Sequence, residues 1–159
     1  MAPVVTCLWF ENQAEEAARF YVSLLPNSSI DRLHPLAADT PSMKKGETIF
    51  VDFTLDGAPY RAMNGGGDFP LTPAVSIFRT CADQAEVDQL WEALLEGGAP
   101  MACGWLTDRF GVSWQIVPDG LLDLFADEDR MRAERAMQAM MTQVKLDIGL
   151  IRAAADQTG

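Results

Sequence analysis

The residue types that could do chemistry are few in this chain and lie far apart. Cys103 stands in the run Cys103-Gly104-Trp105 and could act as a nucleophile, but no histidine or lysine lies near it to activate the thiol. The alternative is that Cys103 is a small buried apolar residue. The single histidine, His34, precedes Pro35 and is either an edge residue or a functional one. No catalytic base can be named, so the sequence leaves open whether the protein is an enzyme.

Glycine and cysteine spacing gives no sign of a cofactor. The glycine run Gly65-Gly66-Gly67 continues into Asp68-Phe69-Pro70, a loop, whereas a nucleotide-type methyl donor is usually held by a strand-to-helix turn. We interpret this run as a linker, with ligand-facing backbone as the alternative. The three cysteines are widely spaced without a C-x-x-C pair, so neither a zinc ribbon nor a disulfide framework is predicted. The sequence predicts no cofactor and a reducing compartment.

The charge balance excludes whole classes of partner. The chain has 12 Lys+Arg against 23 Asp+Glu, a net charge of −11, which would repel both nucleic acid and an anionic membrane surface. Hydrophobic residues make up 48% of the 159 residues, a globular composition. No signal peptide and no run of eighteen apolar residues is found. We therefore expect one folded cytoplasmic domain, residues 1–159.

An internal repeat shows which elements must position the chemistry. Asn12-Gln13-Ala14-Glu15 recurs as Asp83-Gln84-Ala85-Glu86, and a Leu-Leu pair follows each copy at nearly the same distance. Each copy reads as a helix start, with Asn12 or Asp83 as the N-cap and a glutamate three residues later as in a capping box. Apolar residues then recur at helical spacing, so each helix has one face to bury.

Strand-like runs surround both helices. They cover residues 4–10, 28–36, 47–55 and 59–63 in the first copy, and residues 74–81, 101–106 and 112–117 in the second. Asp56-Gly57 favours a tight hairpin. The expected fold class is α+β, with two βαβββ modules in tandem, about 3–66 and 74–118, forming a curved sheet with a cleft.

A helical extension, about residues 121–157, is predicted to follow the second module. Asp127 to Asp129 could open a helix with Met137, Met140, Met141 and Val144 on one face, and Asp147 could cap a second helix over 148–155. A methionine stripe of this kind more often belongs to a core or a subunit interface than to a ligand lid. We expect it to contribute to a homodimer.

Several motifs place the whole pattern in a known family. They are Leu8-Trp9-Phe10, residues 14–21, residues 53–57, Met63-Asn64-Gly65-Gly66, residues 137–141 and, above all, the run from Cys103 to Pro118. These motifs resemble the PhnB-like branch of the glyoxalase/bleomycin-resistance/dioxygenase (vicinal oxygen chelate) superfamily. Related sequences carry a demethylubiquinone methyltransferase label, but no motif here indicates that chemistry.

The resemblance implies a cleft but not the metal that the superfamily's enzymes hold there. Matching by motif puts the four ligand positions near Val5 or Thr6, Ala62, Ala74 and Gln115, and only Gln115 could donate to a metal. No metal site is therefore predicted, although carboxylates elsewhere remain an alternative.

Strand alternation and the same matching predict the residues that line the cleft. With Gln115 facing it, Ser113 and Val117 share that face while Trp114 and Ile116 point to the helices. The predicted cleft residues are Cys7, Trp9, Asn64, Ser76, Phe78, Cys103, Trp105, Ser113 and Gln115. The alternative is that these side chains only pack against each other.

Three functions remain open at this point. The leading hypothesis is metal-independent binding of an unknown, partly apolar small molecule. The second is an isomerase, lyase or transferase that works in the cleft without the usual metal. The third is an interaction protein that uses its acidic surface and methionine helix.

Overall fold

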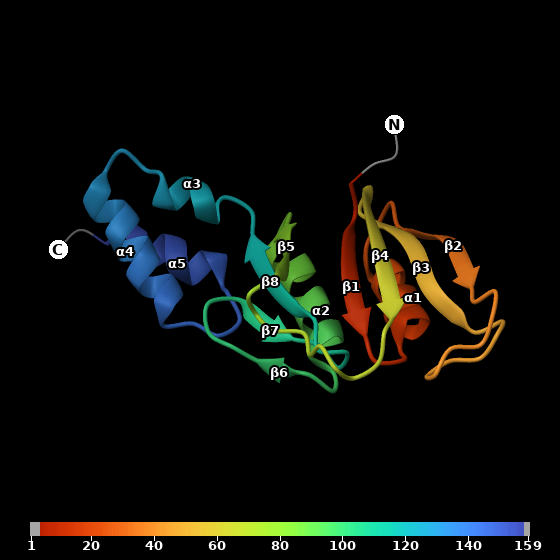
Figure 1. The fold of residues 1–159 in the computed structure, drawn as a ribbon. Coiled ribbons are helices and arrows are strands. Elements are labelled where there is room, and N and C mark those ends of the chain that lie inside the picture. Colours follow the sequence, from red (N-terminus) through yellow and green to blue (C-terminus); the bar gives the residue numbers. More distant parts are fainter. Residues whose placement is uncertain (1–3, 158–159) are drawn as a thin grey trace. The chain divides into compact units, whose positions relative to one another are not determined.

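A computed structural model describes residues 4–157, in two compact units, Met1–Leu71 (unit 1) and Thr72–Gly159 (unit 2). Each unit contains one four-stranded mixed sheet with one helix packed on it (Figure 1). Two tandem modules of α+β class are therefore confirmed. Within the described residues, no helix is long and apolar enough to cross a membrane.

Unit 1 has the order strand, helix, three strands. Its elements are β1 (Thr6–Phe10), α1 (Ala14–Leu24), β2 (Ser29–Pro35), β3 (Thr48–Leu55) and β4 (Ala58–Asn64). The sheet order is β1-β4-β3-β2, with only the β1–β4 pair parallel. Asp56 and Gly57 join β3 to β4 with φ of 46° and 80°, as the predicted tight hairpin requires.

Unit 2 repeats the plan and adds helices. Its sheet, ordered β5-β8-β7-β6, is built from β5 (Ser76–Cys81), β6 (Ala99–Pro100), β7 (Trp105–Thr107) and β8 (Ser113–Pro118), with α2 (Gln84–Leu95) packed on it. The extension consists of α3 (Leu121–Phe125), α4 (Arg130–Met141) and α5 (Ile148–Ala155). These three helices share a core with the end of β8, in which Leu146 and Ile151 are almost fully buried.

Most helix caps lie where the sequence puts them. Asp83 Oδ1 accepts a hydrogen bond from the Glu86 amide at 2.9 Å, and the Glu86 carboxylate accepts one from the Ala82 amide at 2.7 Å. This arrangement resembles the predicted capping box, except that the glutamate reaches the amide one residue before the N-cap. Asp147 Oδ1 caps α5 by accepting from the Leu150 amide at 2.9 Å. The predicted Asn12 cap is wrong, because the N-cap of α1 is Gln13 and that side chain makes no capping bond.

Two predicted element boundaries also need correction. The expected continuous strand over residues 101–106 does not form: β6 ends at Pro100 and β7 begins at Trp105, and in the loop between them Cys103 and Gly104 have φ of 63° and 80°. Positive φ breaks a ladder of extended residues, so one continuous strand cannot form there. Val144 is not on the methionine helix, because α4 ends at Met141.

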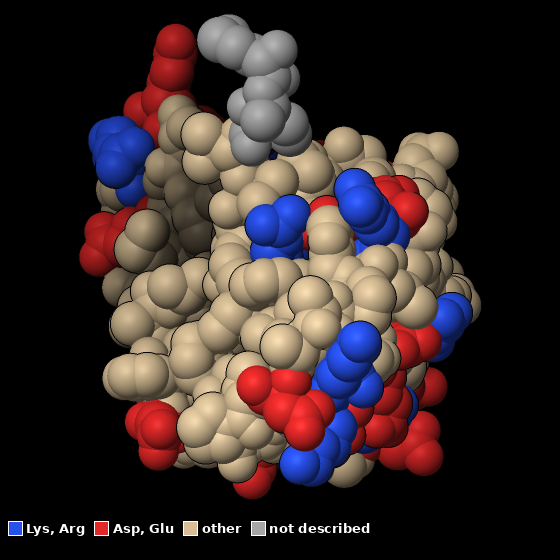
Figure 2. Space-filling model, turned by 45° about the vertical axis from the view of Figure 1, so that its right-hand side comes forward, with Lys and Arg blue, Asp and Glu red and all other residues tan. Residues whose placement is uncertain are grey.

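Some of the surface charges are arranged in local pairs. Several Lys and Arg side chains in Figure 2 lie directly against Asp or Glu side chains. Examples are Arg19 with Glu15 at 2.7 Å and Lys145 with Asp88 at 2.7 Å. Figure 2 shows no broad basic patch on this face, in keeping with the net charge of −11.

Candidate functional site

The face of the unit 1 sheet opposite α1 carries two rows of side chains in register. Leu8, Ala62 and Val51 are buried on the α1 side, so their strand neighbours alternate onto the open face. In the order β1-β4-β3-β2, one row is Cys7, Arg61, Asp52 and Arg32, and the next is Trp9, Met63, Phe50 and His34. This open face is the candidate site.

Asp52 holds the polar row together. Its carboxylate accepts from Arg61 Nε at 2.6 Å and from Arg61 Nη2 at 3.0 Å, a bidentate pair. The same carboxylate lies 2.7 Å from His34 Nε2. The hydrogen bonds from Arg61 are the main cause that lowers the pKa of Asp52, and His34 adds to the effect. Asp52 is therefore an ionised acceptor at neutral pH.

The ionised carboxylate fixes which nitrogen of His34 carries the proton. A carboxylate can only accept, so Nε2 is the donor and the lone pair of the neutral imidazole is at Nδ1. Within residues 4–157, Nδ1 has no hydrogen-bond partner, and about a quarter of the side chain is exposed. The imidazole and the Phe50 ring are nearly perpendicular, with 6.3 Å between ring centroids. In its neutral form, His34 thus has its proton on Nε2 and a lone pair on Nδ1.

The apolar row is bounded on the β1 side by a tryptophan held in place. Trp9 Nε1 donates to the Gly66 carbonyl at 2.7 Å, and Phe69 packs edge-on against the indole with centroids 5.1 Å apart. A Cβ at Gly65 would lie 2.2 Å from the indole, so only glycine lets the ring settle there. The glycine run therefore seats Trp9.

Cys7, beside Arg61 in the polar row, is a weak nucleophile. Burial raises the pKa of its thiol, Arg61 lowers it, Asp52 raises it, and the net shift is upward. The protonated thiol is the unreactive form. Cys7 therefore serves as a small polarizable part of the wall.

Asn64, a predicted cleft residue, has both ends of its amide engaged within unit 1. Its Oδ1 accepts from the Ala14 amide at 2.8 Å, and its Nδ2 donates to the Thr48 carbonyl at 3.0 Å. It thus supplies the cap of α1 that Asn12 does not. The sequence analysis missed this role because the capping residue lies in β4, 50 positions from the amide that it caps.

Replacing Asn64 should therefore destabilise the fold, whereas replacing Asn12 should not. We expect Asn64→Ala to lower the free energy of unfolding by about 1 to 2 kcal/mol, the usual cost of losing a cap. Thermal and urea denaturation of the two single variants measure the difference. Equal losses for Asn64→Ala and Asn12→Ala would contradict this assignment.

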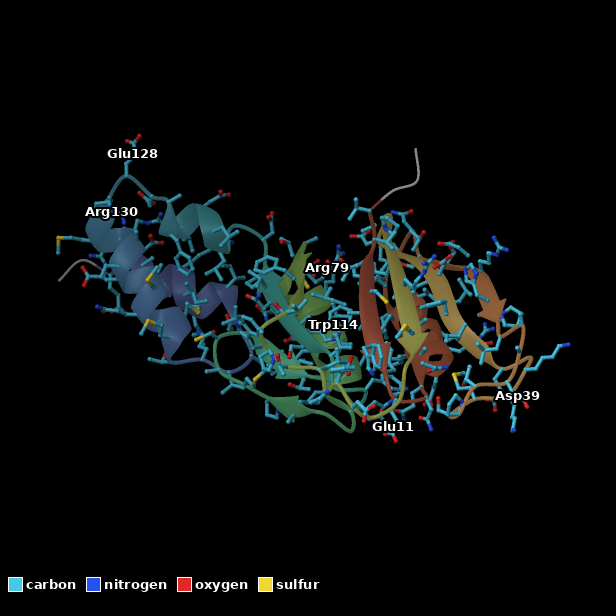
Figure 3. All side chains as sticks on the ribbon, viewed as in Figure 1. Glu11, Asp39, Arg79, Trp114, Glu128 and Arg130 are labelled. Carbon is cyan, nitrogen blue, oxygen red and sulfur yellow. The ribbon has the colours of Figure 1, made fainter. Side chains whose placement is uncertain are left out.

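The open face of the unit 2 sheet carries the predicted neutral polar set. The register places Ser76 and Phe78 beside Ser113 and Gln115, and Trp105 opposite Gln115. Gln115 Nε2 donates to Ser76 Oγ at 2.9 Å. Ser113 is buried, and its hydroxyl has no hydrogen-bond partner among the described residues. Ile116 and Trp114 are fully buried on the α2 side, as predicted, and Arg79, labelled with Trp114 in Figure 3, reaches Glu86 of α2.

Cys103 lies in the loop that receives the C-terminal extension. The Cys103 amide donates to the Gln143 carbonyl and the Gly104 amide to the Val144 carbonyl, both at 2.8 Å. We call residues 143–148 the strap. Gln84 Nε2 donates to the Leu146 carbonyl at 3.0 Å, which ties the strap to α2 as well. The structure thus places Cys103 against the strap. Trp105, two residues later, lies on the open face of the unit 2 sheet.

The residues at the matched metal positions do not fit a metal. Ala62 has no exposed surface and lies on the α1 side of β4, so its assignment as an inward ligand position is wrong. The amide of Gln115 is engaged with Ser76, and the carboxylate of Asp52 with Arg61 and His34. In residues 4–157 no group of three or more His, Cys, Asp or Glu side chains could hold a metal ion. The donor set supplies no metal chemistry.

Unit 1 also has an acidic concavity that the sequence analysis did not predict. It has a volume of about 610 Å³ and is lined partly by Glu11, Glu15 and Glu47, of which Glu11 is labelled in Figure 3. Glu15 is engaged with Arg19, and Glu47 accepts from the Lys44 amide at 2.6 Å. Its three carboxylates come from the loop before α1, from α1 itself and from the loop before β3, so no local sequence motif indicates this concavity.

Comparison with known proteins places this chain in a family. Residues 2–117 match the sequence model of the family described as 3-demethylubiquinone-9 3-methyltransferase, which is well over half of the chain. The chain belongs to this family. No curated protein sequence matches it.

Solved structures agree with this family assignment. A PhnB protein from Bacillus cereus is 33% identical, with a TM-score of 0.67 over 74% of this chain and 99% of that chain. Protein PA1353 from Pseudomonas aeruginosa, 23% identical with a TM-score of 0.60 over 75% and 100% of the two chains, shows the same fold. The predicted PhnB-like branch is confirmed. Because the family match ends at residue 117, α3 to α5 lie outside it.

Proposed function

We propose that this PhnB-like protein binds a small, flat, partly apolar molecule on the open face of unit 1, without a metal. The observation that supports this most strongly is the pair of registered rows, one apolar and one polar. Trp9, Met63 and Phe50 offer a half-buried apolar floor, with the Asp52 cluster along one side. A mostly apolar surface with a few fixed polar groups is the usual make-up of a small-molecule site.

The charges of the site favour a ligand with one polar end. Arg61 is paired with Asp52 through Nε and Nη2, which leaves the N–H groups of Nη1 for a ligand oxygen. The guanidinium also lies over Phe50, with Cζ 5.3 Å from the ring centroid. An oxygen acceptor next to an aromatic ring would meet both groups.

Binding can be tested with matched methionine variants. We expect benzoate, phenylpyruvate or duroquinone to raise the melting temperature of the full chain, with micromolar to millimolar dissociation constants by calorimetry. Met63→Ala should weaken binding about tenfold, since it removes part of the floor. Met131→Ala on α4, a residue 69% exposed, should leave the dissociation constant unchanged. Equal effects of the two variants, or no binding by any probe, would disprove the proposal.

An enzyme is the second candidate function, and the observation that favours it is His34 held by Asp52 at 2.7 Å. The sequence named no base, and this pair supplies one with its lone pair at a defined nitrogen. The open reaction classes are those expected at the outset, an isomerase, lyase or transferase.

The remaining assignments stay proposals of the same kind. We propose a homodimer because α4 exposes Met131, Met137 and Met141 by 69%, 44% and 62%. Light scattering should give twice the chain mass of 17.4 kDa, and a single-chain mass at all concentrations would overturn it. The assignment of residues 1–159 to one domain and the cytoplasmic location also stay predictions.

A further inference from the structure

We propose that His34 and Asp52 form a proton-transfer pair that interconverts the keto and enol forms of an aromatic 2-oxo acid on the open face of unit 1. This inference rests on the proposed function, because it uses the same site. It goes further by naming the substrate class, the reacting atoms and the base.

The geometry of the pair is that of an oriented base. Asp52 Oδ2 accepts a hydrogen bond from His34 Nε2–H at 2.7 Å, so the Nδ1 lone pair is free to take a proton. Asp52 is in turn held by two hydrogen bonds from Arg61 on the neighbouring strand. The base, its orienting carboxylate and a cation thus come from three adjacent strands, β2, β3 and β4.

Charged groups of both signs lie near His34 in the sheet. Asp52 faces it from β3 and Arg61 lies beyond Asp52 on β4, while Asp31 and Arg32 precede it on β2. Asp31 is occupied by the hydroxyls of Ser29 and Thr54, at 2.7 and 2.8 Å. Asp52 is therefore the acid that acts on His34, and it stabilises the imidazolium that forms.

The substrate class follows from what lies beside the base. Phe50 contacts both polar groups, with its ring centroid 6.3 Å from that of His34 and 5.3 Å from Arg61 Cζ. A ligand ring on Met63 and Phe50 would place its oxygen-bearing side chain between these groups. An arylpyruvate has an acidic C–H between ring and carbonyl, which suits a base on one side and a cation on the other.

The step balances without a co-reactant. His34 Nδ1 takes the proton from the carbon between the ring and the carbonyl, and the C–H electron pair becomes the C=C bond. The carbonyl π pair moves onto oxygen, where the Nη1 hydrogens of Arg61 stabilise the enolate. The imidazolium then returns the proton to oxygen or to carbon, so nothing is oxidised or reduced.

The test is deuterium exchange of phenylpyruvate in D₂O, followed by proton NMR, with binding measured by calorimetry on the same samples. The full chain should exchange the benzylic hydrogens at least tenfold faster than buffer. His34→Gln should return the rate to that of buffer with a dissociation constant within about threefold of the parent.

Asp52 acts through His34, so its variants need a finer readout. Asp52→Asn should lower the saturating rate about 10²-fold with little change in KM, and Asp52→Glu should restore part of the rate. Asp88→Asn is the matched control, since it removes a carboxylate paired with Lys145 at 2.7 Å in unit 2 and should leave the rate unchanged.

The outcomes separate the two proposals. Failure of phenylpyruvate and every other probe to bind overturns the proposed function and this inference together. Binding of phenylpyruvate without accelerated exchange, or exchange that survives His34→Gln, overturns proton transfer alone. If Asp52→Asn fails to fold by circular dichroism, the His34→Gln result decides.

Discussion

Replacing Asp108 by alanine should lower the free energy of unfolding by about 3 to 5 kcal/mol, the cost of unpairing several buried donors. Asp108 is 3% exposed and accepts three hydrogen bonds, from the amides of Phe110 and Val112 at 2.9 and 3.0 Å and from Trp114 Nε1 at 2.9 Å. It thus shapes the turn between β7 and β8 and fixes the largest fully buried side chain of unit 2.

Urea denaturation followed by tryptophan fluorescence measures this loss. Asp68→Ala, which removes an exposed carboxylate from a loop, is the control and should change stability by no more than about 0.5 kcal/mol. Asp108→Asn keeps one acceptor oxygen and should fall between the two. A loss below about 1 kcal/mol for Asp108→Ala would mean that the turn forms without this carboxylate.

The second large effect is expected at Gly104, where Gly104→Ala should cost about 2 to 4 kcal/mol. Its φ is +80°, and an added Cβ would lie 2.8 Å from both the Ile116 carbonyl oxygen and Leu146 Cδ1. The Ile116 oxygen belongs to the backbone of β8, and Leu146 is a buried residue of the strap. The substitution should therefore loosen the strap as well as strain the loop.

A control substitution at a second glycine separates the loss of stability caused by steric overlap from the loss caused by backbone strain. Gly46 has φ of +93° with no atom within 4 Å of an added Cβ, so Gly46→Ala carries the backbone strain alone, about 1 kcal/mol. Limited proteolysis should cut Gly104→Ala within residues 143–148 faster than it cuts Gly46→Ala. Equal stability losses and equal cleavage rates would disprove the contact argument.

Most helices and turns of the fold were predictable because the residues that determine each of them lie close together in the sequence. Helical periodicity, the Asp83 and Asp147 caps and the Asp56-Gly57 turn all act within a few residues, and the structure confirms them. The strand break at Cys103 was missed, because a non-glycine residue at positive φ leaves no compositional signal.

The candidate site was harder to predict because it depends on register. Ser29 opposes Thr54 on the open face, and simple alternation from Ser29 would turn His34 toward α1. The register shift between Ile30 and Arg32 adds one residue and brings His34 opposite Phe50. Nothing local to His34 indicates this bulge, so the sequence could not pair His34 with Asp52.

The cap that Asn64 supplies to α1 has a consequence for how the chain folds. α2 obtains its cap from Asp83, three residues from its bonding partner, so its first turn can close while the rest of unit 2 is still unfolded. The Ala14 amide of α1 is instead bonded by Asn64, 50 positions away. That bond can form only after the intervening chain has closed into a loop, which costs conformational entropy. We therefore expect the two copies of one sequence repeat to nucleate differently, the second around its helix and the first around the pairing of β1 with β4.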